Sequence, residues 1–355
     1  MREFTWVDGE RTIHFGPVAV EPLGGPGYTL LTTPRAAAAA PQIAGAAGAV
    51  HHVGPGQVHE LAGALLGEVH GDRIVALGGG RVIDVAKALA AAANARYGAA
   101  DSPGAASRRG LVRAMAVPTT LSGAELTSGH RHATGVDDAT PRVRPAVVVF
   151  DPALAASQPI PELAASSLNA LGHAVEGPCT VRANPVATLA AHEAARLIAG
   201  GWSTEEPDRE TLALGALLAG YVIDSTGLGL HHIVAQSLVR AAGAGHGPAN
   251  AAVLPHTIGA LATRTPRAIA ALDAAVHGEQ LAATEAHDTP PTAAGLVAVA
   301  RHIGARAGAT SLRAIGVDEA ALGKAADAAA ARPQLANTPP PATRDEILAL
   351  YQAAL

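Results

Sequence analysis

The sequence is poor in several residue types, and each shortage excludes a class of protein. Its 355 residues include a single cysteine, Cys179, so no disulfide can form within the chain. Aromatic residues make up only 3% and charged residues 15%, whereas 49% are hydrophobic. This balance is typical of a globular protein rather than a disordered one. A chain of this length can form two domains with large cores.

Other absences concern the partners of the protein. The formal charge of -5 and a pI near 6.3 leave no basic excess for nucleic acid. No apolar run is long and unbroken enough to span a membrane, which takes about 18 residues. The opening segment MREFTWVDGE is polar and has no apolar signal core. We therefore expect a soluble, cytoplasmic protein that binds neither nucleic acid nor membranes.

The two halves of the sequence have different hydrophobic patterns. Short apolar runs alternate with alanine-rich helical stretches up to residue 152, which predicts a parallel sheet with helices on both faces. The expected strands are 27–34, 49–54, 72–80, 111–120 and 144–152, and the expected helices are 34–48, 59–69 and 82–95. From residue 153 onward the apolar residues recur at helical spacing. The sequence thus predicts an α/β domain (1–152) and an all-helical domain (153–355), with the functional site in the cleft between them.

Two polar turns follow predicted strands of the first half. In ALGGGRVIDVAK (76–87) a strand runs into three glycines and a helix begins at once. Glycines let a backbone approach a pyrophosphate, and the free N–H groups at a helix start attract its charge. In VPTTLSGAELT (117–127) hydroxyl groups suitable for ribose and phosphate follow another strand. Each turn alone is equally explained by tight chain reversal or helix capping, but two turns on neighbouring strands favour a dinucleotide site.

Histidines gather in the second half. Asn169 and His173 are four residues apart and share a helix face, and His232 and Gln236 repeat that spacing. His246 follows in AGHGPANAAVLPH. Imidazoles that converge from separate helices form metal or substrate sites in helical bundles. Because the chain has 16 histidines, a chance grouping explains the spacing equally well.

These motifs together resemble the iron-containing alcohol dehydrogenase superfamily. GGGRVIDVAKA is similar to its GGGS-x-x-D-x-A-K signature, and VPTTLSGAELT is similar to its P-T-T-x-x-G-S-E-x-T turn. The stretch NALGHAVEG, the run GLHH and the ending NTPPPATR (337–344) resemble the maleylacetate reductase branch. The resemblance covers nearly the whole chain with order and spacing kept. It implies a Rossmann-like N-terminal domain and a helical-bundle C-terminal domain.

The resemblance also implies a nicotinamide cofactor, NADH or NADPH, with the preference left open. The glycines would hold its pyrophosphate, and the Thr-Thr turn would face its adenosine and nicotinamide parts. The implied cofactor-binding residues are Gly78, Gly79, Gly80, Arg81, Asp84, Thr119, Thr120, Ser122, Arg142, Thr32 and Thr33.

In the second half the resemblance implies a metal or substrate site. Three of the four metal-ligand positions of the family are matched by His173, His232 and His246, and Asn169 stands where the fourth ligand is normally Asp. An amide binds Fe or Zn more weakly than a carboxylate, so occupancy of this site is doubtful. The implied catalytic set is His173, His232, His246 and Gln236. Protonated imidazoles would neutralise an anionic substrate, and a histidine would supply the proton that accompanies hydride transfer.

Three features depart from the family pattern. Gln236 replaces a titratable histidine, Arg81 replaces the serine after the glycines, and the segment His-Arg-His (130–132) stands where the family is mostly apolar. The residues of this segment would bind a carboxylate or phosphate, or lie in a solvated loop. We predict an NAD(P)H-dependent reductase of a small anionic keto or enoyl substrate, similar to maleylacetate reductase and homodimeric. The alternative is a non-redox enzyme on the same scaffold, catalysing an elimination, isomerisation or condensation.

Overall fold

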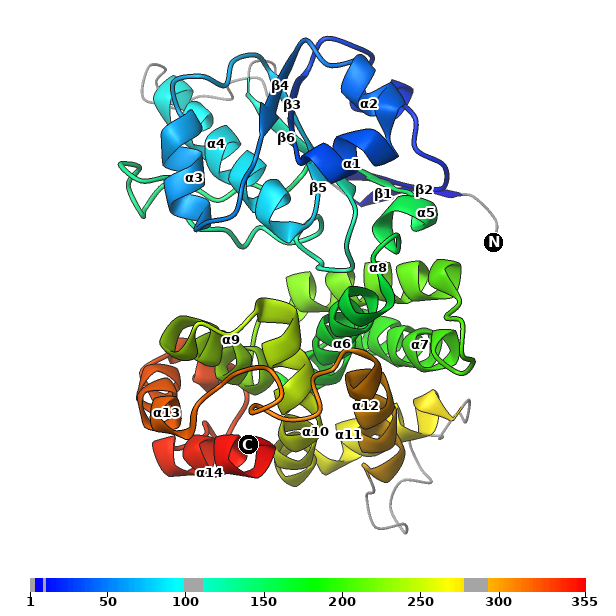
Figure 1. Ribbon diagram of the computed structural model, residues 1–355, viewed down its shortest axis with the longest axis vertical. Coiled ribbons are helices and arrows are strands. Elements are labelled where there is room, and N and C mark those ends of the chain that lie inside the picture. Colours follow the sequence, from blue (N-terminus) through cyan, green and yellow to red (C-terminus); the bar gives the residue numbers. More distant parts are fainter. Residues whose placement is uncertain (1–3, 9–10, 99–110, 278–292) are drawn as a thin grey trace. The chain divides into compact units, whose positions relative to one another are not determined.

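The computed structural model describes residues 4–8, 11–98, 111–277 and 293–355 (Figure 1). The chain divides into two compact units, Met1–Ser157 and Gln158–Leu355. The boundary therefore follows Ser157, whereas the sequence placed it after residue 152.

The first unit is built on one seven-stranded sheet in the order β1-β2-β7-β6-β5-β3-β4. Its outermost pair, β1 and β2, is antiparallel, and all other neighbouring strands are parallel. The predicted parallel sheet is confirmed, and the β1–β2 hairpin is an addition that the sequence did not reveal. The strands are β1 (Phe4–Asp8), β2 (Arg11–Phe15), β3 (Thr29–Thr32), β4 (Ala49–His52), β5 (Arg73–Gly78), β6 (Arg113–Pro118) and β7 (Val147–Phe150).

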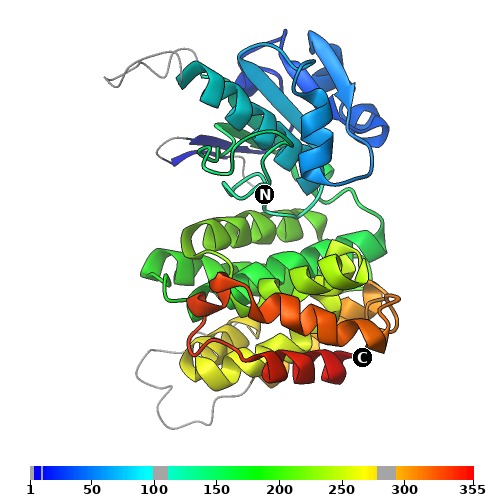
Figure 2. The same cartoon turned by 90° about the vertical axis from the view of Figure 1, so that its left-hand side faces the viewer.

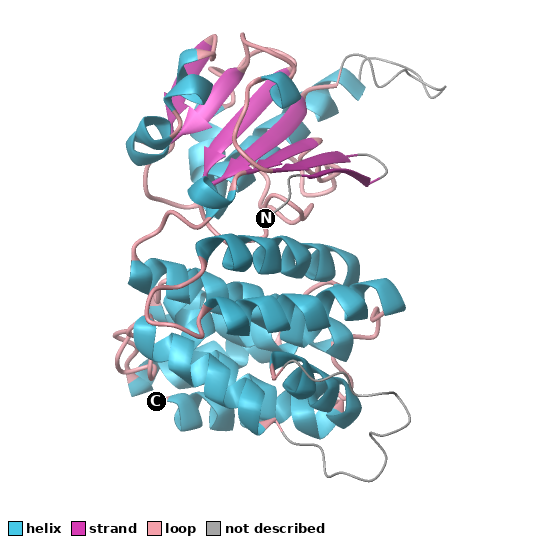
Figure 3. Ribbon diagram, turned by 90° about the vertical axis from the view of Figure 1, so that its right-hand side faces the viewer, coloured by secondary structure: helices cyan, strands magenta, loops and turns pink. Residues whose placement is uncertain are grey.

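Helices cover both faces of this sheet (Figure 3). Successive side chains of a strand point to opposite faces, and those of β5 follow this rule. Ile74 and Ala76 join a core cluster with α3 (Val58–Leu65) and α4 (Gly80–Gly98). Val75 and Leu77 join a second cluster on the other face. That cluster includes residues of α1 (Pro34–Ala39), α2 (Pro41–Gly45) and α5 (Pro152–Ala155).

The second unit contains only helices and loops in the part of the chain that the structure describes (Figure 2). Its central helix is α6, whose residues from Leu163 to Glu176 are all buried. Helices α7, α8, α10 and α12 pack around it. The helices are α6 (Ile160–Glu176), α7 (Pro185–Gly201), α8 (Arg209–Thr226), α9 (Leu230–Ala242), α10 (His246–Arg264), α11 (Pro266–Val276), α12 (Ala294–Arg306), α13 (Leu322–Ala330) and α14 (Arg344–Ala354).

Short 3-10 helices occur in both units, at Glu21–Leu23, Gly177–Cys179, Glu319–Ala321 and Pro333–Asn337. Within the described ranges no single helix is long and apolar enough to cross a membrane. Helices α8 and α9 reach that length and hydropathy only as a pair bent by 97°.

Candidate functional site

The two polar turns of the first unit lie side by side. We call residues 78–80 the glycine turn and residues 118–123 the threonine turn. Gly78 at the end of β5 is in register with Pro118 at the end of β6. The backbone N–H of Thr119 donates to the carbonyl of Gly78 at 3.0 Å. The expectation that both turns occupy one edge of the sheet is therefore met.

Close packing between the turns explains why glycines are needed. A Cβ atom at position 79 would lie 2.9 Å from Cγ2 of Thr120, and one at position 80 would lie 3.1 Å from Oγ of Ser122. The backbone of α4 thus begins directly beside the threonine turn. No acidic residue occupies the first turn of α4, so its free N–H groups are available to an anion. The Oγ1 atom of Thr120 is buried and has no hydrogen-bond partner among the residues that the structure describes.

Lys87 fixes the segment that follows the threonine turn. Its side chain is fully buried, and Nζ donates to the carbonyls of Ala124, Thr127 and Gly129 at 2.8–3.1 Å. Nζ also forms an ion pair with Asp84 at 2.7 Å, one helical turn earlier on α4. The carboxylate of Asp84, predicted to bind the cofactor, therefore neutralises a buried ammonium group.

The other predicted cofactor residues of this unit lie in different surroundings. Thr32 is fully buried and its hydroxyl donates to the carbonyl of Leu77, while Thr33 caps α1. Arg81 is exposed and reaches the carbonyl of Gly54 at 3.4 Å. Arg142 donates through Nε to the carbonyl of His130 at 3.1 Å. Contact of these four side chains with a cofactor stays a prediction.

The interpretation of residues 130–132 as a solvated loop is wrong for the two histidines, whereas Arg131 between them is exposed. The side chains of His130 and His132 are buried and meet edge to face, with ring centroids 5.1 Å apart. Burial lowers the pKa of His130 to about 4, and the neighbouring positive charges of Lys87 and Arg142 act in the same direction. His130 is therefore a neutral packing element, and the buried ring of His132 packs against it.

In the second unit the fold brings the predicted histidines together. The rings of His173 on α6 and His232 on α9 are stacked, with centroids 4.5 Å apart and an interplanar angle of 20°. His231 meets the His232 ring edge-on at 4.8 Å. Asn169 is also buried, one turn before His173 on α6. His246 begins α10 and is exposed, and its ring lies 3.4 Å from Nδ2 of Asn250.

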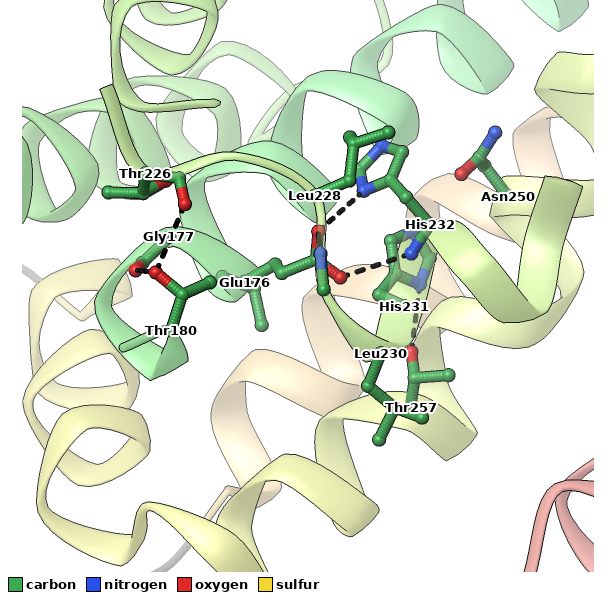
Figure 4. A network of polar contacts seen from close by, with 12 residues as sticks. Glu176, Gly177, Thr180, Thr226, Leu228, Leu230, His231, His232, Asn250 and Thr257 are labelled. Atoms are coloured by element: carbon green, nitrogen blue, oxygen red, sulfur yellow. Dashed lines mark hydrogen bonds and ion pairs between the residues drawn. The ribbon is translucent and has the colours of Figure 1, made fainter. Parts of the chain in front are cut away.

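A buried carboxylate, Glu176, contacts both the backbone and the ring of His232 (Figure 4). Its Oε1 accepts from the backbone N–H of Gly229 at 2.6 Å and lies 3.2 Å from Nδ1 of His232. Its Oε2 accepts from the backbone N–H of His232 at 3.1 Å. The neighbouring His231 is held separately, with Nδ1 2.9 Å from Oγ1 of Thr257. The start of α9 is therefore tied to the end of α6 at three atoms.

Burial decides the charge of these groups. It lowers the pKa of His173 well below the usual range and that of His231 to about 3, and the neighbouring imidazoles act in the same direction. Burial likewise lowers the pKa of His232 and raises that of Glu176, although backbone N–H donors partly oppose the second shift. At neutral pH His173, His231 and His232 are therefore neutral, contrary to the expectation of protonated imidazoles.

The donor set does not form a ready-made metal site. Across the described ranges, no group of three or more His, Cys, Asp or Glu side chains is placed to hold an ion. Asn169 also supplies no negative charge. Gln236, one turn after His232, accepts a long hydrogen bond of 3.4 Å from Arg332. Position 236 therefore carries an amide next to a guanidinium group.

Sequence reasoning missed two residues of this site. Glu176 lies three residues after His173 within the quoted stretch NALGHAVEG, and His231 stands inside the quoted run GLHH. A glutamate one helical turn after a candidate catalytic histidine was a usable signal. The hydrogen-bond partners of Glu176, Gly229 and His232, could not be predicted, because they are 53 and 56 residues away in the sequence.

Comparison with known proteins identifies the family. The model for "Iron-containing alcohol dehydrogenase" matches residues 36–152, and the model for "Fe-containing alcohol dehydrogenase family, C-terminal" matches residues 163–355. This chain belongs to the iron-containing alcohol dehydrogenase family. The membership confirms the resemblance, the combination of a Rossmann-like and a helical domain, and an NAD(P)-dependent oxidoreductase.

Maleylacetate reductases are among the family members most similar to this chain. Maleylacetate reductase 1 from Rhodococcus opacus is 32% identical over 86% of this chain and 79% of its own. Maleylacetate reductase from Sphingobium indicum is 31% identical over 92% and 88%. The structure of maleylacetate reductase from Rhizobium sp. superposes with a TM-score of 0.74 at 27% identity, covering 100% of this chain and 98% of its own. An iron-containing alcohol dehydrogenase from Corynebacterium glutamicum gives 0.74 at 25% identity, covering 97% and 94%.

Proposed function

We propose that this enzyme reduces a small anionic keto or enoyl acid, maleylacetate or a close relative, with NADH or NADPH. The observation that carries the proposal is the buried, stacked pair of His173 and His232, set beside Asn169 in the helical unit. Uncharged imidazoles in such surroundings can bind and protonate a carbonyl compound. The maleylacetate reductases compared above support a reductase over the non-redox alternative.

The nested turns of the first unit fit a dinucleotide. The backbone of Gly79 and Gly80 at the start of α4 would hold the pyrophosphate, and the hydroxyl of Thr120 would bind an adjacent polar group. When bound, the nicotinamide supplies the hydride. Lys87 contributes indirectly, because it fixes the backbone that follows the threonine turn.

Protonation of the substrate falls to the histidines of the second unit. A neutral imidazole can polarise a carbonyl through its N–H group and then give up that proton, and triosephosphate isomerase uses a histidine in this state. Since Glu176 already contacts Nδ1 of His232, His173 and His246 are the candidates for this role. No step is assigned to a metal ion, since the described donor set does not form a metal site. Cytoplasmic location and a homodimer stay predictions.

The test is a titration of the purified enzyme with NADH and with NADPH, followed by nicotinamide fluorescence, with metal content measured on the same sample. Micromolar binding of either cofactor, followed by its oxidation in the presence of maleylacetate, supports the proposal. His173→Asn should abolish turnover and leave cofactor binding intact, whereas the exposed His302→Asn should change neither. If the enzyme binds neither NADH nor NADPH, hydride transfer is refuted.

A further inference from the structure

Arg81 follows the glycine turn directly, at the position where the family pattern has a serine. It is the second residue of α4, and its side chain is exposed. Among the residues that the structure describes, it forms no ion pair, and its hydrogen bond from Nη1 to the carbonyl of Gly54 is long at 3.4 Å. A guanidinium group carries five N–H donors, so most of those of Arg81 remain available to a ligand.

The contact with Gly54 places the guanidinium group of Arg81 beside the end of β3. In the sheet β3 lies between β5 and β4, and the three strands are parallel. Their carboxyl ends therefore meet at one edge. Arg81 follows β5 through the glycine turn, whereas Gly54 follows β4. The Arg81 side chain thus extends from the turn after β5 to the turn after β4, the two turns that flank the end of β3.

The turns at this edge contain no acidic residue. They are residues 33–35, 53–57 and 79–83, which follow β3, β4 and β5. Asp84, the next residue of α4, forms an ion pair with the buried Nζ of Lys87 at 2.7 Å. In dinucleotide-binding folds an Asp or Glu binds the ribose 2′-hydroxyl of NAD, whereas an Arg accommodates the 2′-phosphate of NADP. This edge therefore has the residue type that suits a phosphate and lacks the one that suits a free hydroxyl.

We propose that the enzyme binds NADPH in preference to NADH, and that Arg81 binds the 2′-phosphate of the adenosine ribose. A guanidinium group can form two parallel hydrogen bonds with phosphate oxygens while it neutralises part of their charge. The N–H groups at the start of α4 would hold the adjacent pyrophosphate. This inference rests on the proposed use of a nicotinamide cofactor and narrows that use to one of the two cofactors.

The experiment measures the Kd of NADPH and of NADH by fluorescence titration of the wild type and two variants. The wild type should bind NADPH about 10- to 100-fold more tightly than NADH, and Arg81→Gln should raise the Kd of NADPH by a similar factor while changing that of NADH less than about threefold. The matched control is Arg96→Gln, because Arg96 is an exposed arginine in the last turn of the same helix. This control should change neither Kd.

A third variant, Thr33→Asp, tests the end of β3 itself. Thr33 is the N-cap of α1, and its Oγ1 accepts from the backbone N–H of Ala36 at 3.2 Å. Aspartate is at least as good an N-cap as threonine, so α1 should be retained, which circular dichroism can verify. The added carboxylate should repel the 2′-phosphate and bind the free 2′-hydroxyl of NADH. The preference for NADPH should therefore decrease or reverse.

The inference fails if the wild type binds NADH as tightly as NADPH or more tightly, although the proposed reductase would then stand. It also fails if Arg81→Gln weakens both cofactors by the same factor, because Arg81 would then contact the pyrophosphate that they share. An equal loss of NADPH binding in Arg96→Gln would assign the effect to general charge rather than to contact. If neither cofactor binds to the wild type, the proposed function itself fails.

Discussion

Replacing Gly172 by alanine tests how tightly the histidine set is packed. Gly172 lies in the interior of α6, immediately before His173. A Cβ atom there would be 2.5 Å from Nε2 and 2.7 Å from Cδ2 of His231, and 3.5 Å from Cε1 of His232. The His231 ring is fully buried and is held at Thr257. It must move by roughly 1 Å to restore ordinary contact distances of about 3.4 Å or more.

Gly172→Ala is expected to make two contributions of opposite sign to the free energy of unfolding. Alanine in place of glycine favours a helix interior by about 1 kcal/mol. Overpacking costs about 1–3 kcal/mol, and the strained contact to Thr257 costs about 1 kcal/mol more. We therefore expect Gly172→Ala to lower the free energy of unfolding by about 1–3 kcal/mol. Because His231 packs edge-on against His232, a displacement near 1 Å should also lower kcat on the order of 100-fold.

Urea unfolding followed by circular dichroism, together with kcat for the preferred substrate, measures both effects. Gly259→Ala is the matched control, because this glycine lies in the interior of α10 with no atom within 4 Å of an added Cβ. The control should be stabilised by up to about 1 kcal/mol. A Gly172→Ala enzyme with the stability gain of the control and full activity would refute the argument.

Three further predictions concern the first unit. Gly79→Ala should raise the Kd for the preferred cofactor at least about 10-fold, measured by fluorescence titration, because its Cβ would press on Thr120 where the turns nest; an unchanged Kd would remove this turn from the cofactor site. Lys87→Met should lower the free energy of unfolding, measured in urea, by about 3 kcal/mol, since three buried carbonyls lose a charged donor. A decrease below about 1 kcal/mol would contradict the role of Lys87 in fixing the segment after the threonine turn. Because burial lowers the pKa of His130 to about 4 from 6.5, the unfolded chain gains a proton first, and stability falls as pH drops from 6.5 toward 4. The free energy of unfolding of His130→Leu should therefore fall by about 2 kcal/mol less than that of the wild type between pH 7.5 and 5. Equal decreases in the two proteins would show that His130 titrates normally.

Much of the first unit followed from local patterns. The run RIVAL ends in glycines and is succeeded by α4, so strand, turn and helix could be placed from sequence spacing alone. The alanine-rich stretch 34–48 was predicted as one helix but forms two, because Pro41 cannot continue the backbone hydrogen bonding of α1. The β1–β2 hairpin was missed because its strands have only five residues each and include charged side chains.

Only those residues of the candidate site that stand in recognisable sequence motifs could be predicted. His173 and His232 could be chosen because their motifs match a family, and the structure stacks them together. Their charge state could not be predicted, since it depends on burial by helices far apart in sequence. Glu176 was missed for the same physical reason. Its importance comes from N–H groups that reach it only after α9 has docked against α6.

This long-range tie has a consequence for folding. The hydrogen bonds from Gly229 and His232 to Glu176 join positions 53 and 56 residues apart, with α7 and α8 between them. Closing so long a segment costs entropy that local helix formation does not repay. The cluster of His173, His231 and His232 is therefore assembled late, after the intervening helices have formed. Recovery of activity after dilution from denaturant should accordingly lag behind the recovery of helical circular dichroism.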